Sequence, residues 1–334
     1  MPLPTVFVTR RIPEQGLNKV LAHCQAEVWP EQLPPPYEVL LEKVKNCDGL
    51  LSLLTDRIDA KLIAAAPKLK VISNFAVGFN NIDIPAATQR GICVGNTPGV
   101  LTDATADMAF CLLIAAARRV VEGHNYTISG QWKTWEPLGH IGVDLAGRTV
   151  GIVGMGRIGF ALAKRCHAGW DMKVLYHDVY RNEKAEKEFG ARSVDMDTLL
   201  RESDFVSVHT DLNDKTKGMF NAACFAKMKK TAVFINTARG PIQNQKDLYT
   251  ALKNGTIFAA GLDVTDPEPP SPDDPLLRLP NVVVAPHIAS ATMETRGAMA
   301  DIAADNLIAG LQGKPLRHCV NPEVMELRKA SDQR

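Results

Sequence analysis

The sequence lacks the features that mark several large classes of protein. Its 38 Lys and Arg residues nearly balance its 37 Asp and Glu residues, which leaves a formal net charge of +1, and the basic residues do not cluster. Its longest uncharged apolar run, Met108 to Ala117, is too short to cross a bilayer. Because neither a basic field nor a long apolar segment is present, we expect no nucleic-acid partner and no membrane association.

Paired cysteines and histidines are also absent. The seven cysteines contain no CxxC pair, the eight histidines contain no HxxxH or HxH pair, and no GxSxG motif occurs. Residues 1–11 show no charged start followed by an apolar stretch, which is the pattern of a secretory signal. These absences argue against a zinc site, a hydrolase nucleophile elbow and an oxidising compartment. We therefore predict no metal, reduced thiols and a cytoplasmic location.

The pattern of apolar residues predicts an α/β protein with two domains. A chain of 334 residues is too long for one ordinary core. Short apolar runs alternate with amphipathic stretches, which is typical of parallel sheets wrapped by helices. The predicted strands of the first series are Thr5–Thr9, Gly49–Leu53, Val71–Asn74 and Ile92–Gly95. Those of the second series are Thr149–Val153, Lys173–Tyr176, Phe205–Val208, Ala232–Asn236, Ile257–Leu262 and Val282–Ala285.

Capping residues indicate where helices begin and end. Thr102 or Asp103 can cap a helix that continues over Ala104–Ala117, which is apolar nearly all round and therefore buried on most sides. A last helix is predicted over Met293–Leu311. Three glycines suit left-handed helix caps: Gly169, Gly190 and Gly255.

The segment of residues 120–147 shows little periodicity and contains Trp132 and Trp135. It is either a long arm packed on a partner or a surface loop.

A glycine-rich motif, Gly154-Met-Gly156-Arg-Ile-Gly159, follows a predicted strand and opens a helix over Ile158–His167. The first glycine makes a tight turn, the second lets the backbone approach a pyrophosphate, and the third lets helix and strand pack closely. The helix start offers unpaired N–H groups to phosphates, so Arg157 and Ile158 are expected cofactor contacts as well. The motif predicts a dinucleotide site.

The nature of the dinucleotide depends on Asp178, nineteen residues past Gly159 at the end of the next predicted strand. A carboxylate there accepts hydrogen bonds from the adenine ribose hydroxyls and repels a 2′-phosphate, which favours NAD over NADP. Arg181 lies close behind and could hold that phosphate, so NADP stays open.

Three polar residues follow strands of the second series. Arg239, Glu268 and His287 each come shortly after a predicted strand, and ligands of open parallel sheets sit beyond the carboxyl ends of the strands. Arg matches a carboxylate in shape, and His can give a proton to a carbonyl oxygen. A neighbouring Glu favours the protonated imidazole. The set therefore predicts hydride reduction of a 2-oxo acid.

At these residues the sequence resembles the D-isomer-specific 2-hydroxyacid dehydrogenase family, from about Val6 to Val320. The stretches that carry the resemblance are residues 74–83, 96–107, 154–159, 236–240, 261–269 and 286–292. The segment with Trp132 and Trp135, and the Asp266–Pro270 run, look most like the glyoxylate/hydroxypyruvate reductase branch.

The resemblance implies a fold of two Rossmann-like, doubly wound parallel-sheet domains. The dinucleotide-binding domain, residues 101–287, would be inserted into a substrate domain made of residues 1–100 and 288–334.

The resemblance also implies roles for the residues of the active site. Arg239 would bind the substrate carboxylate and carbonyl, and His287, paired with Glu268, would donate the proton. Val77 and Gly78 would offer backbone N–H groups to the carboxylate.

Other residues are expected to contact the nicotinamide or to come from a partner. Thr237, Asp263 and Ala289 would lie at the nicotinamide end. Trp135 of the partner protomer would reach the active site in a homodimer; the alternative is an ordinary interface or core aromatic.

A few positions depart from the family pattern. Ala289 stands where glycine is usual, Asp211 stands where proline is common, and Gln243-Asn-Gln245 replaces Val-Asp-Glu. We expect the last change to have no chemical consequence.

The expected activity is NAD(P)H-dependent reduction of glyoxylate or hydroxypyruvate to glycolate or D-glycerate. The alternatives are a D-lactate-type or a D-3-phosphoglycerate dehydrogenase, and more remotely a dinucleotide-sensing, corepressor-like binding protein. Residues 75–80 contain no basic side chain that would bind a phosphorylated substrate.

Overall fold

The computed structural model describes residues 2–326 and divides the chain into two compact units. The terminal unit contains residues 1–101 and 291–334, and the central unit is Thr102–Ser290. Residues 327–334, which the expected substrate domain includes, lie outside the described residues. Within residues 2–326, the longest apolar helices still fall short of what a membrane span requires.

The terminal unit is built on a five-stranded parallel sheet. Its strand order is β2-β1-β3-β4-β5, one of the two common orders of doubly wound sheets. The strands are β1 (Thr5–Val8), β2 (Gln25–Val28), β3 (Gly49–Ser52), β4 (Val71–Asn74) and β5 (Cys93–Gly95). The helices are α1 (Glu14–His23), α2 (Tyr37–Lys43), η1 (Val44–Asn46), α3 (Ala60–Ala64), α4 (Ile84–Gln89) and α12 (Met293–Leu311).

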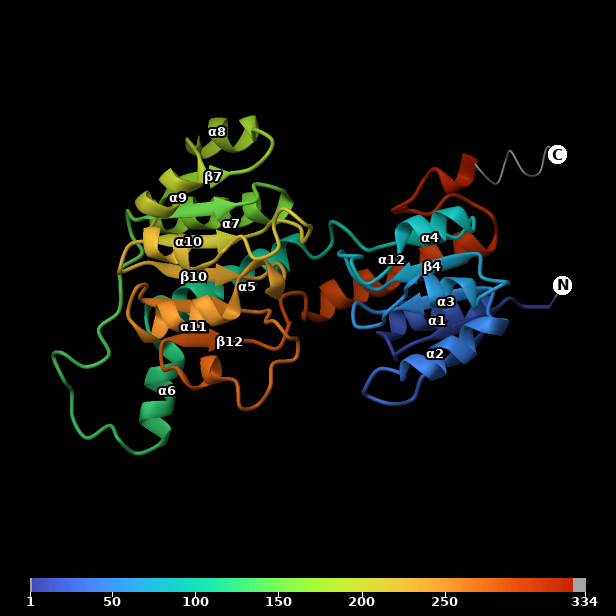
Figure 1. Ribbon diagram of the computed structural model, residues 1–334, viewed down its shortest axis with the longest axis horizontal. Helices are drawn as coiled ribbons and strands as arrows, with labels where there is room; N and C mark the ends of the chain where they lie inside the picture. The colour runs from blue at the N-terminus through green and yellow to red at the C-terminus, as the bar shows by residue number, and fades with distance from the viewer. Residues whose placement is uncertain (1, 327–334) are drawn as a thin grey trace. The chain divides into compact units, whose positions relative to one another are not determined.

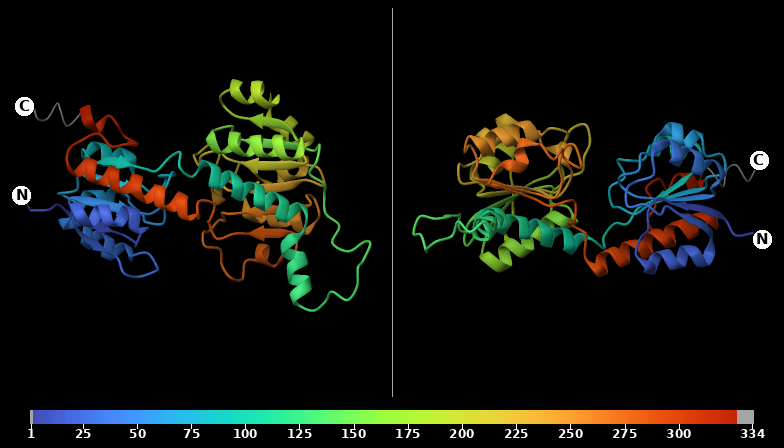
Figure 2. Two further views of the ribbon diagram at one scale, coloured as in Figure 1. Left: turned by 180° about the vertical axis from the view of Figure 1, so that it is seen from behind. Right: turned by 90° about the horizontal axis from the view of Figure 1, so that it is seen from below.

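Helices cover both faces of this sheet. Leu17 and Val20 of α1 pack with Ala300 and Leu307 of α12 in the core on one face. Figure 2 shows these two helices side by side below the sheet. The other face is covered by α2, α3 and α4. The sheet is therefore buried on both sides, as parallel sheets usually are.

The central unit is built on a seven-stranded parallel sheet with the order β12-β11-β10-β9-β6-β7-β8 (Figure 1). The strands are β6 (Thr149–Val153), β7 (Lys173–His177), β8 (Arg192–Ser193), β9 (Phe205–Val208), β10 (Val233–Asn236), β11 (Ala259–Leu262) and β12 (Val282–Val284). The order reverses between β6 and β9, which is the switch point where dinucleotides bind in Rossmann folds.

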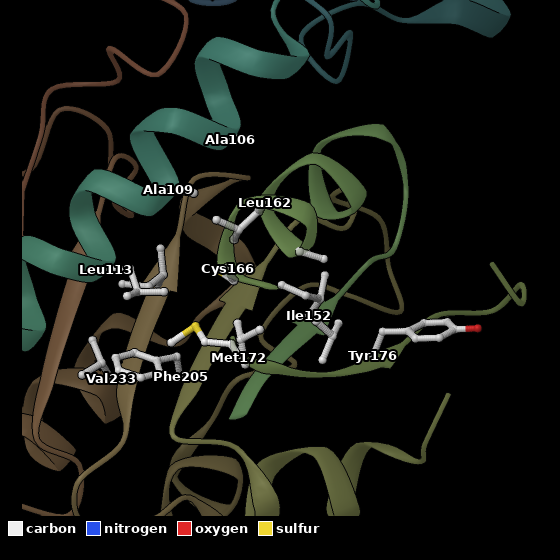
Figure 3. Packing of buried hydrophobic residues seen from close by; sticks show 14 of the residues in the cluster. Ala106, Ala109, Leu113, Ile152, Leu162, Cys166, Met172, Tyr176, Phe205 and Val233 are labelled. Atoms are coloured by element: carbon white, nitrogen blue, oxygen red, sulfur yellow. The ribbon is translucent and has the colours of Figure 1, made fainter. Parts of the chain in front are cut away.

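Helices again cover the two faces. Figure 3 shows residues of α5 (Thr102–Ala117) and α7 (Arg157–Trp170) packed on one face of the sheet, around Phe205 and Val233. The opposite face is covered by α9 (Met196–Glu202), α10 (Ala222–Lys227) and α11 (Gln245–Lys253). The remaining elements of this unit are α6 (Val120–Ile128), α8 (Glu183–Phe189), η2 (Gly240–Ile242) and η3 (Pro275–Arg278).

The predicted fold class is confirmed, with a few differences in detail. The prediction that Gly169 caps a helix is wrong: α7 continues to Trp170 and ends at Asp171, which takes the left-handed conformation with φ 52°. Gly190 does adopt that conformation at the end of α8, with φ 63°. The edge strands β2 and β8 have no apolar run, because their residues are largely exposed, and the sequence pattern missed both.

Candidate active site

Three neighbouring strands of the central sheet place the predicted catalytic residues at one edge. β10, β11 and β12 are adjacent and parallel, so their carboxyl ends meet at the same side. Arg239 follows β10, Glu268 lies in the loop after β11, and His287 follows β12. The fold therefore brings a guanidinium, a carboxylate and an imidazole to one edge of one sheet.

His287 and Glu268 form a direct side-chain pair. The His287 Nδ1 atom lies 2.5 Å from Oε1 of Glu268, which is a short contact. Their side chains are 23% and 33% exposed, respectively, so both reach solvent from a partly covered site. A carboxylate on Nδ1 orients the ring and leaves Nε2 to face a substrate.

The backbone of His287 is held in an unusual conformation. Its φ is 54°, in the left-handed region that residues other than glycine adopt at a cost of roughly 1–3 kcal/mol. Its N–H donates to the carbonyls of Asp263 and Ala285 at 3.0 and 3.1 Å. The next two N–H groups, of Ile288 and Ala289, each donate to a carboxylate oxygen of Asp263 at 2.8 Å.

Asp263 is the buried anchor of this turn. Only 1% of its surface is exposed, and burial raises the pKa of its carboxyl group, while the N–H groups of Ile288 and Ala289 oppose the rise. Both carboxylate oxygens are used by backbone donors. Asp263 therefore positions His287, whereas its expected contact with nicotinamide stays a prediction.

Arg239 is half-buried next to two carboxylates. Burial lowers its pKa, and the nearby negative charges of Glu268 and Asp211 oppose that shift. A guanidinium remains charged at neutral pH even so. Its Nη1 donates to the Ala238 carbonyl at 2.7 Å, and the Asn236 side chain donates to the Arg239 carbonyl at 2.9 Å. The group is thus a fixed positive charge beside the Glu268–His287 pair.

The glycine loop after β6 has the geometry that the motif predicts. Gly154 has φ 96°, and a Cβ on Gly159 would lie 2.1 Å from the Gly154 carbonyl oxygen, so only glycine allows this helix and loop to meet. A Cβ on Gly156, by contrast, would meet no atom of the described residues within 4 Å. Gly156 is the N-cap of α7 and has no side chain to cover the N–H groups of Arg157 and Ile158. This leaves a backbone cradle open at a helix N-terminus, which fits a pyrophosphate.

Asp178 lies directly beside this loop. Its Oδ2 accepts the N–H of Met155 at 2.7 Å, and its Oδ1 accepts the N–H of Tyr180 at 3.2 Å. The carboxylate is therefore fixed at the carboxyl end of β7, where a ribose of a bound dinucleotide would lie.

Thr237 provides a second indication of a ligand site. It is 7% exposed, and its Oγ1 atom is buried without a hydrogen-bond partner among residues 2–326. Buried hydroxyls normally find a partner. Thr237 follows β10, two residues before Arg239, at the place expected for the nicotinamide end, so the residues present fit a dinucleotide.

Two predicted substrate contacts belong to the terminal unit. The carbonyl of Val77 accepts a hydrogen bond from the Asn96 side chain at 2.8 Å, and that of Gly78 accepts one from Asn74 at 3.0 Å. The loop is therefore pinned by its carbonyls. The contact of Val77 and Gly78 with substrate stays a prediction.

Trp135 lies in the long segment after α6, which extends away from the central sheet in Figure 1. It is 80% exposed within this chain, so it is not a core aromatic of the chain itself. Its contact with a partner stays a prediction.

The residues at positions 243–245 have structural roles that the sequence did not indicate. Gln245 accepts the N–H of Asp266 at 2.8 Å and donates to Asp274 at 2.6 Å, which ties down both ends of the loop that carries Glu268. Asn244 caps α11, and Gln243 accepts a hydrogen bond from Asn236. Nothing in the spacing of these residues pointed to the Glu268 loop.

His209 is a second residue that the sequence analysis missed. It follows β9, and its Nε2 lies 2.9 Å from the Ser207 hydroxyl. A Cβ on Gly154 would lie 2.7 Å from the His209 carbonyl carbon, so the glycine loop rests against its backbone. Loss of hydration lowers the pKa of His209 to about 3, which keeps the imidazole neutral.

With the fold and these residues in place, the family can be assigned. Residues 110–289 match the model of the NAD binding domain of D-isomer specific 2-hydroxyacid dehydrogenases. The chain belongs to that family, as the resemblance predicted, and it is an NAD(P)-dependent oxidoreductase.

Individual relatives narrow the comparison. A glyoxylate reductase of Korarchaeum cryptofilum is 53% identical over 97% of this chain and 98% of its own length. The TT0316 protein of Thermus thermophilus has a similar structure, with a TM-score of 0.89 and 44% identity over 95% of this chain and 99% of its own. An NADPH-dependent glyoxylate/hydroxypyruvate reductase of Sinorhizobium meliloti, solved with NADP and malonate, also has a similar structure. Its TM-score is 0.83, with 30% identity over 96% of this chain and 98% of its own.

Proposed function

We propose that this enzyme reduces glyoxylate and hydroxypyruvate to glycolate and D-glycerate with a reduced nicotinamide dinucleotide. The observation that carries the proposal is the Glu268–His287 pair, 2.5 Å apart, at the sheet edge where Arg239 also lies. These groups supply the charge and the proton that reduction of a 2-oxo acid needs.

Arg239 binds the substrate carboxylate through its planar guanidinium and draws electron density from the neighbouring carbonyl. His287 donates a proton from Nε2 to the carbonyl oxygen, while Glu268 on Nδ1 holds the ring in place. The bound nicotinamide supplies the hydride that the 2-oxo carbon receives. Val77 and Gly78 are proposed as further ligands of the substrate carboxylate, through their backbone N–H groups.

The dinucleotide would be held by residues of the central unit. The backbone of Gly154, Gly156, Arg157, Ile158 and Gly159 would hold its pyrophosphate, and a Cβ on Gly156 would meet no described atom within 4 Å there. Asp178 would bind the adenine ribose. Thr237 offers its unpartnered hydroxyl at the nicotinamide end, and the turn of Asp263 and Ala289 borders that end.

A short, unphosphorylated substrate is supported by two observations. The Korarchaeum cryptofilum relative carries the name glyoxylate reductase at 53% identity. The loop around Val77 and Gly78 has no basic residue from Phe75 to Asn80, so a phosphorylated acid has no counter-charge there. The D-lactate-type and D-3-phosphoglycerate alternatives are not favoured.

The quaternary structure and location are part of the proposal. We infer a homodimer in which Trp135 of each protomer reaches the partner's active site, because an indole that is 80% exposed on an extended segment is suited to a second surface. A cytoplasmic location is supported by the seven cysteines, all of which are free thiols.

Initial rates test the proposal. The purified enzyme is assayed with glyoxylate, hydroxypyruvate, pyruvate and phosphohydroxypyruvate, each with NADH and with NADPH. We expect kcat/KM to be highest for glyoxylate or hydroxypyruvate. A preference for pyruvate or for the phosphorylated acid would reject the substrate assignment, and slow turnover of all four would favour a cofactor-sensing protein instead.

A further inference from the structure

The turn after β7 is held against the glycine loop at two points. Asp178 accepts the N–H of Met155, and the Asn182 side chain donates to the Met155 carbonyl at 2.8 Å. Residues 178–182 therefore have a fixed place beside the dinucleotide cradle. The side chains of this turn are therefore held at fixed places relative to Asp178. Arg181 is the basic residue of the turn.

Arg181 is already engaged by Glu186. Its Nε and Nη2 atoms donate to Oε1 and Oε2 of Glu186 at 3.1 and 2.6 Å, which is a two-point, planar pair. The pair raises the pKa of Arg181 and lowers that of Glu186. The Arg181 side chain is 72% exposed, so the pair adds little to folding stability, but it does determine where the guanidinium points.

Glu186 is itself held in place by Tyr176 of β7. The Tyr176 hydroxyl donates to Glu186 Oε1 at 2.6 Å and accepts the N–H of Asn182 at 2.9 Å. Tyr176 is fully buried in β7, and Figure 3 shows its ring extending away from the α5 and α7 side of the core with the hydroxyl at its far end. A core residue therefore sets the position of Glu186, and Glu186 sets that of Arg181.

We propose that Glu186 makes the enzyme prefer NAD over NADP, because it occupies the Arg181 guanidinium that a 2′-phosphate would need. This inference rests on the dinucleotide site proposed above. A ribose with free hydroxyls requires only Asp178, and its binding does not depend on the Arg181–Glu186 pair. A 2′-phosphate brings up to two negative charges towards Asp178 and Glu186 and has to compete with Glu186 for its counter-ion.

The Glu186→Gln variant tests this proposal. Glutamine keeps the length of the side chain and an oxygen for the Tyr176 hydroxyl but removes the charge that holds Arg181. We expect the affinity for 2′,5′-ADP, measured by titration calorimetry, to rise about tenfold, as one freed charge-assisted contact would give. The affinity for 5′-AMP, which has no 2′-phosphate, stays within about twofold.

Two further variants separate the pair from general electrostatics. Glu188→Gln removes the same charge from the same helix, where Glu188 lies 3.8 Å from Lys184, and we expect no change in the ratio of the two affinities. In the double variant Arg181→Ala/Glu186→Gln the gain for 2′,5′-ADP is lost. The NADPH-to-NADH ratio of kcat/KM with glyoxylate is expected to follow the same order.

The outcomes distinguish this inference from the proposed function. If wild-type enzyme binds 5′-AMP and NADH but Glu186→Gln leaves 2′,5′-ADP binding unchanged, the role of Glu186 is rejected. The proposed dinucleotide site is then still supported. An equal gain in Glu188→Gln, or a gain that persists without Arg181, also rejects it. Failure of the wild type to bind 5′-AMP and NADH would instead reject the dinucleotide site.

Discussion

Asp263 holds the turn that carries His287 through both its carbonyl and its carboxylate. The carbonyl accepts the N–H of His287 at 3.0 Å, and the two carboxylate oxygens accept the N–H groups of Ile288 and Ala289 at 2.8 Å each. The left-handed conformation of His287 thus depends on the buried side chain of Asp263, which directly follows the neighbouring strand β11.

Replacing that carboxylate should reduce turnover by misplacing the imidazole. In Asp263→Asn one N–H acceptor becomes an NH₂ donor facing a backbone donor, so we expect kcat to fall about 10- to 100-fold, since small displacements of catalytic groups have effects of that size. Steady-state kinetics with glyoxylate measures this. Asp266→Asn, an exposed change in the neighbouring loop, is the control and should stay near wild type. Equal rates in the two variants would show that Asp263 does not position His287.

The glycine loop contains one glycine needed for folding and one needed for binding. A Cβ at Gly159 would meet the Gly154 carbonyl at 2.1 Å, so Gly159→Ala should destabilise the protein by about 1–3 kcal/mol or more. A Cβ at Gly156 meets open space. Gly156→Ala should therefore melt like the wild type yet bind NADH about tenfold or more weakly, because the methyl group lies where the pyrophosphate would be. Thermal melts and fluorescence titration measure the two effects; unweakened NADH binding in Gly156→Ala would contradict the placement of the cofactor.

His209 should make stability depend on pH in the acid range. The folded imidazole, with its pKa lowered to about 3, stays neutral, while the unfolded chain takes up a proton below about pH 6.5. The free energy of unfolding should therefore fall between about pH 6.5 and 3, by up to about 1.4 kcal/mol per pH unit from this residue. Urea unfolding at several pH values measures the slope. His209→Asn should flatten it, whereas His23→Asn, an exposed control, should not. The same slope in both variants would contradict a neutral, partly buried His209.

The sequence predicted that Arg239, Glu268 and His287 lie at one edge, because each follows an apolar strand and parallel strands carry such residues to the same edge. It could not predict Glu186, since the signal that selects it is the Tyr176 hydroxyl at the end of a buried strand, and no sequence spacing records that contact. Gln245 was missed for the same reason, because its partners Asp266 and Asp274 lie far along the chain.

Helix ends and edge strands were the least predictable parts of the fold. Glycine is the residue type that usually caps a helix, which favoured Gly169, but the chain adopts the left-handed conformation at Asp171, between α7 and β7. β2 lies at the edge of its sheet with Gln25 and Glu27 exposed, so it has no apolar pattern to detect.

Trp135 should affect substrate binding if it enters the partner's active site. Trp135→Ala is expected to raise KM for glyoxylate about tenfold while the dissociation constant of NADH changes little, because the indole would cover the substrate and not the cofactor. Trp132→Ala, which removes an aromatic residue of the same segment that is 62% exposed, is the matched control. Light scattering on both variants shows whether the dimer persists. A KM unchanged by Trp135→Ala in a dimeric enzyme would remove Trp135 from the site.

The central claim, that His287 gives the proton to the 2-oxo acid, is tested most directly by His287→Asn. Asparagine tolerates the left-handed conformation with φ 54° and so preserves the turn, but it cannot donate a proton as imidazolium does. Single-turnover oxidation of bound NADH by glyoxylate should slow by about 10²–10⁴-fold, with the dissociation constant of NADH within about threefold of wild type. A variant that binds NADH normally and oxidises it at the wild-type rate would contradict the account.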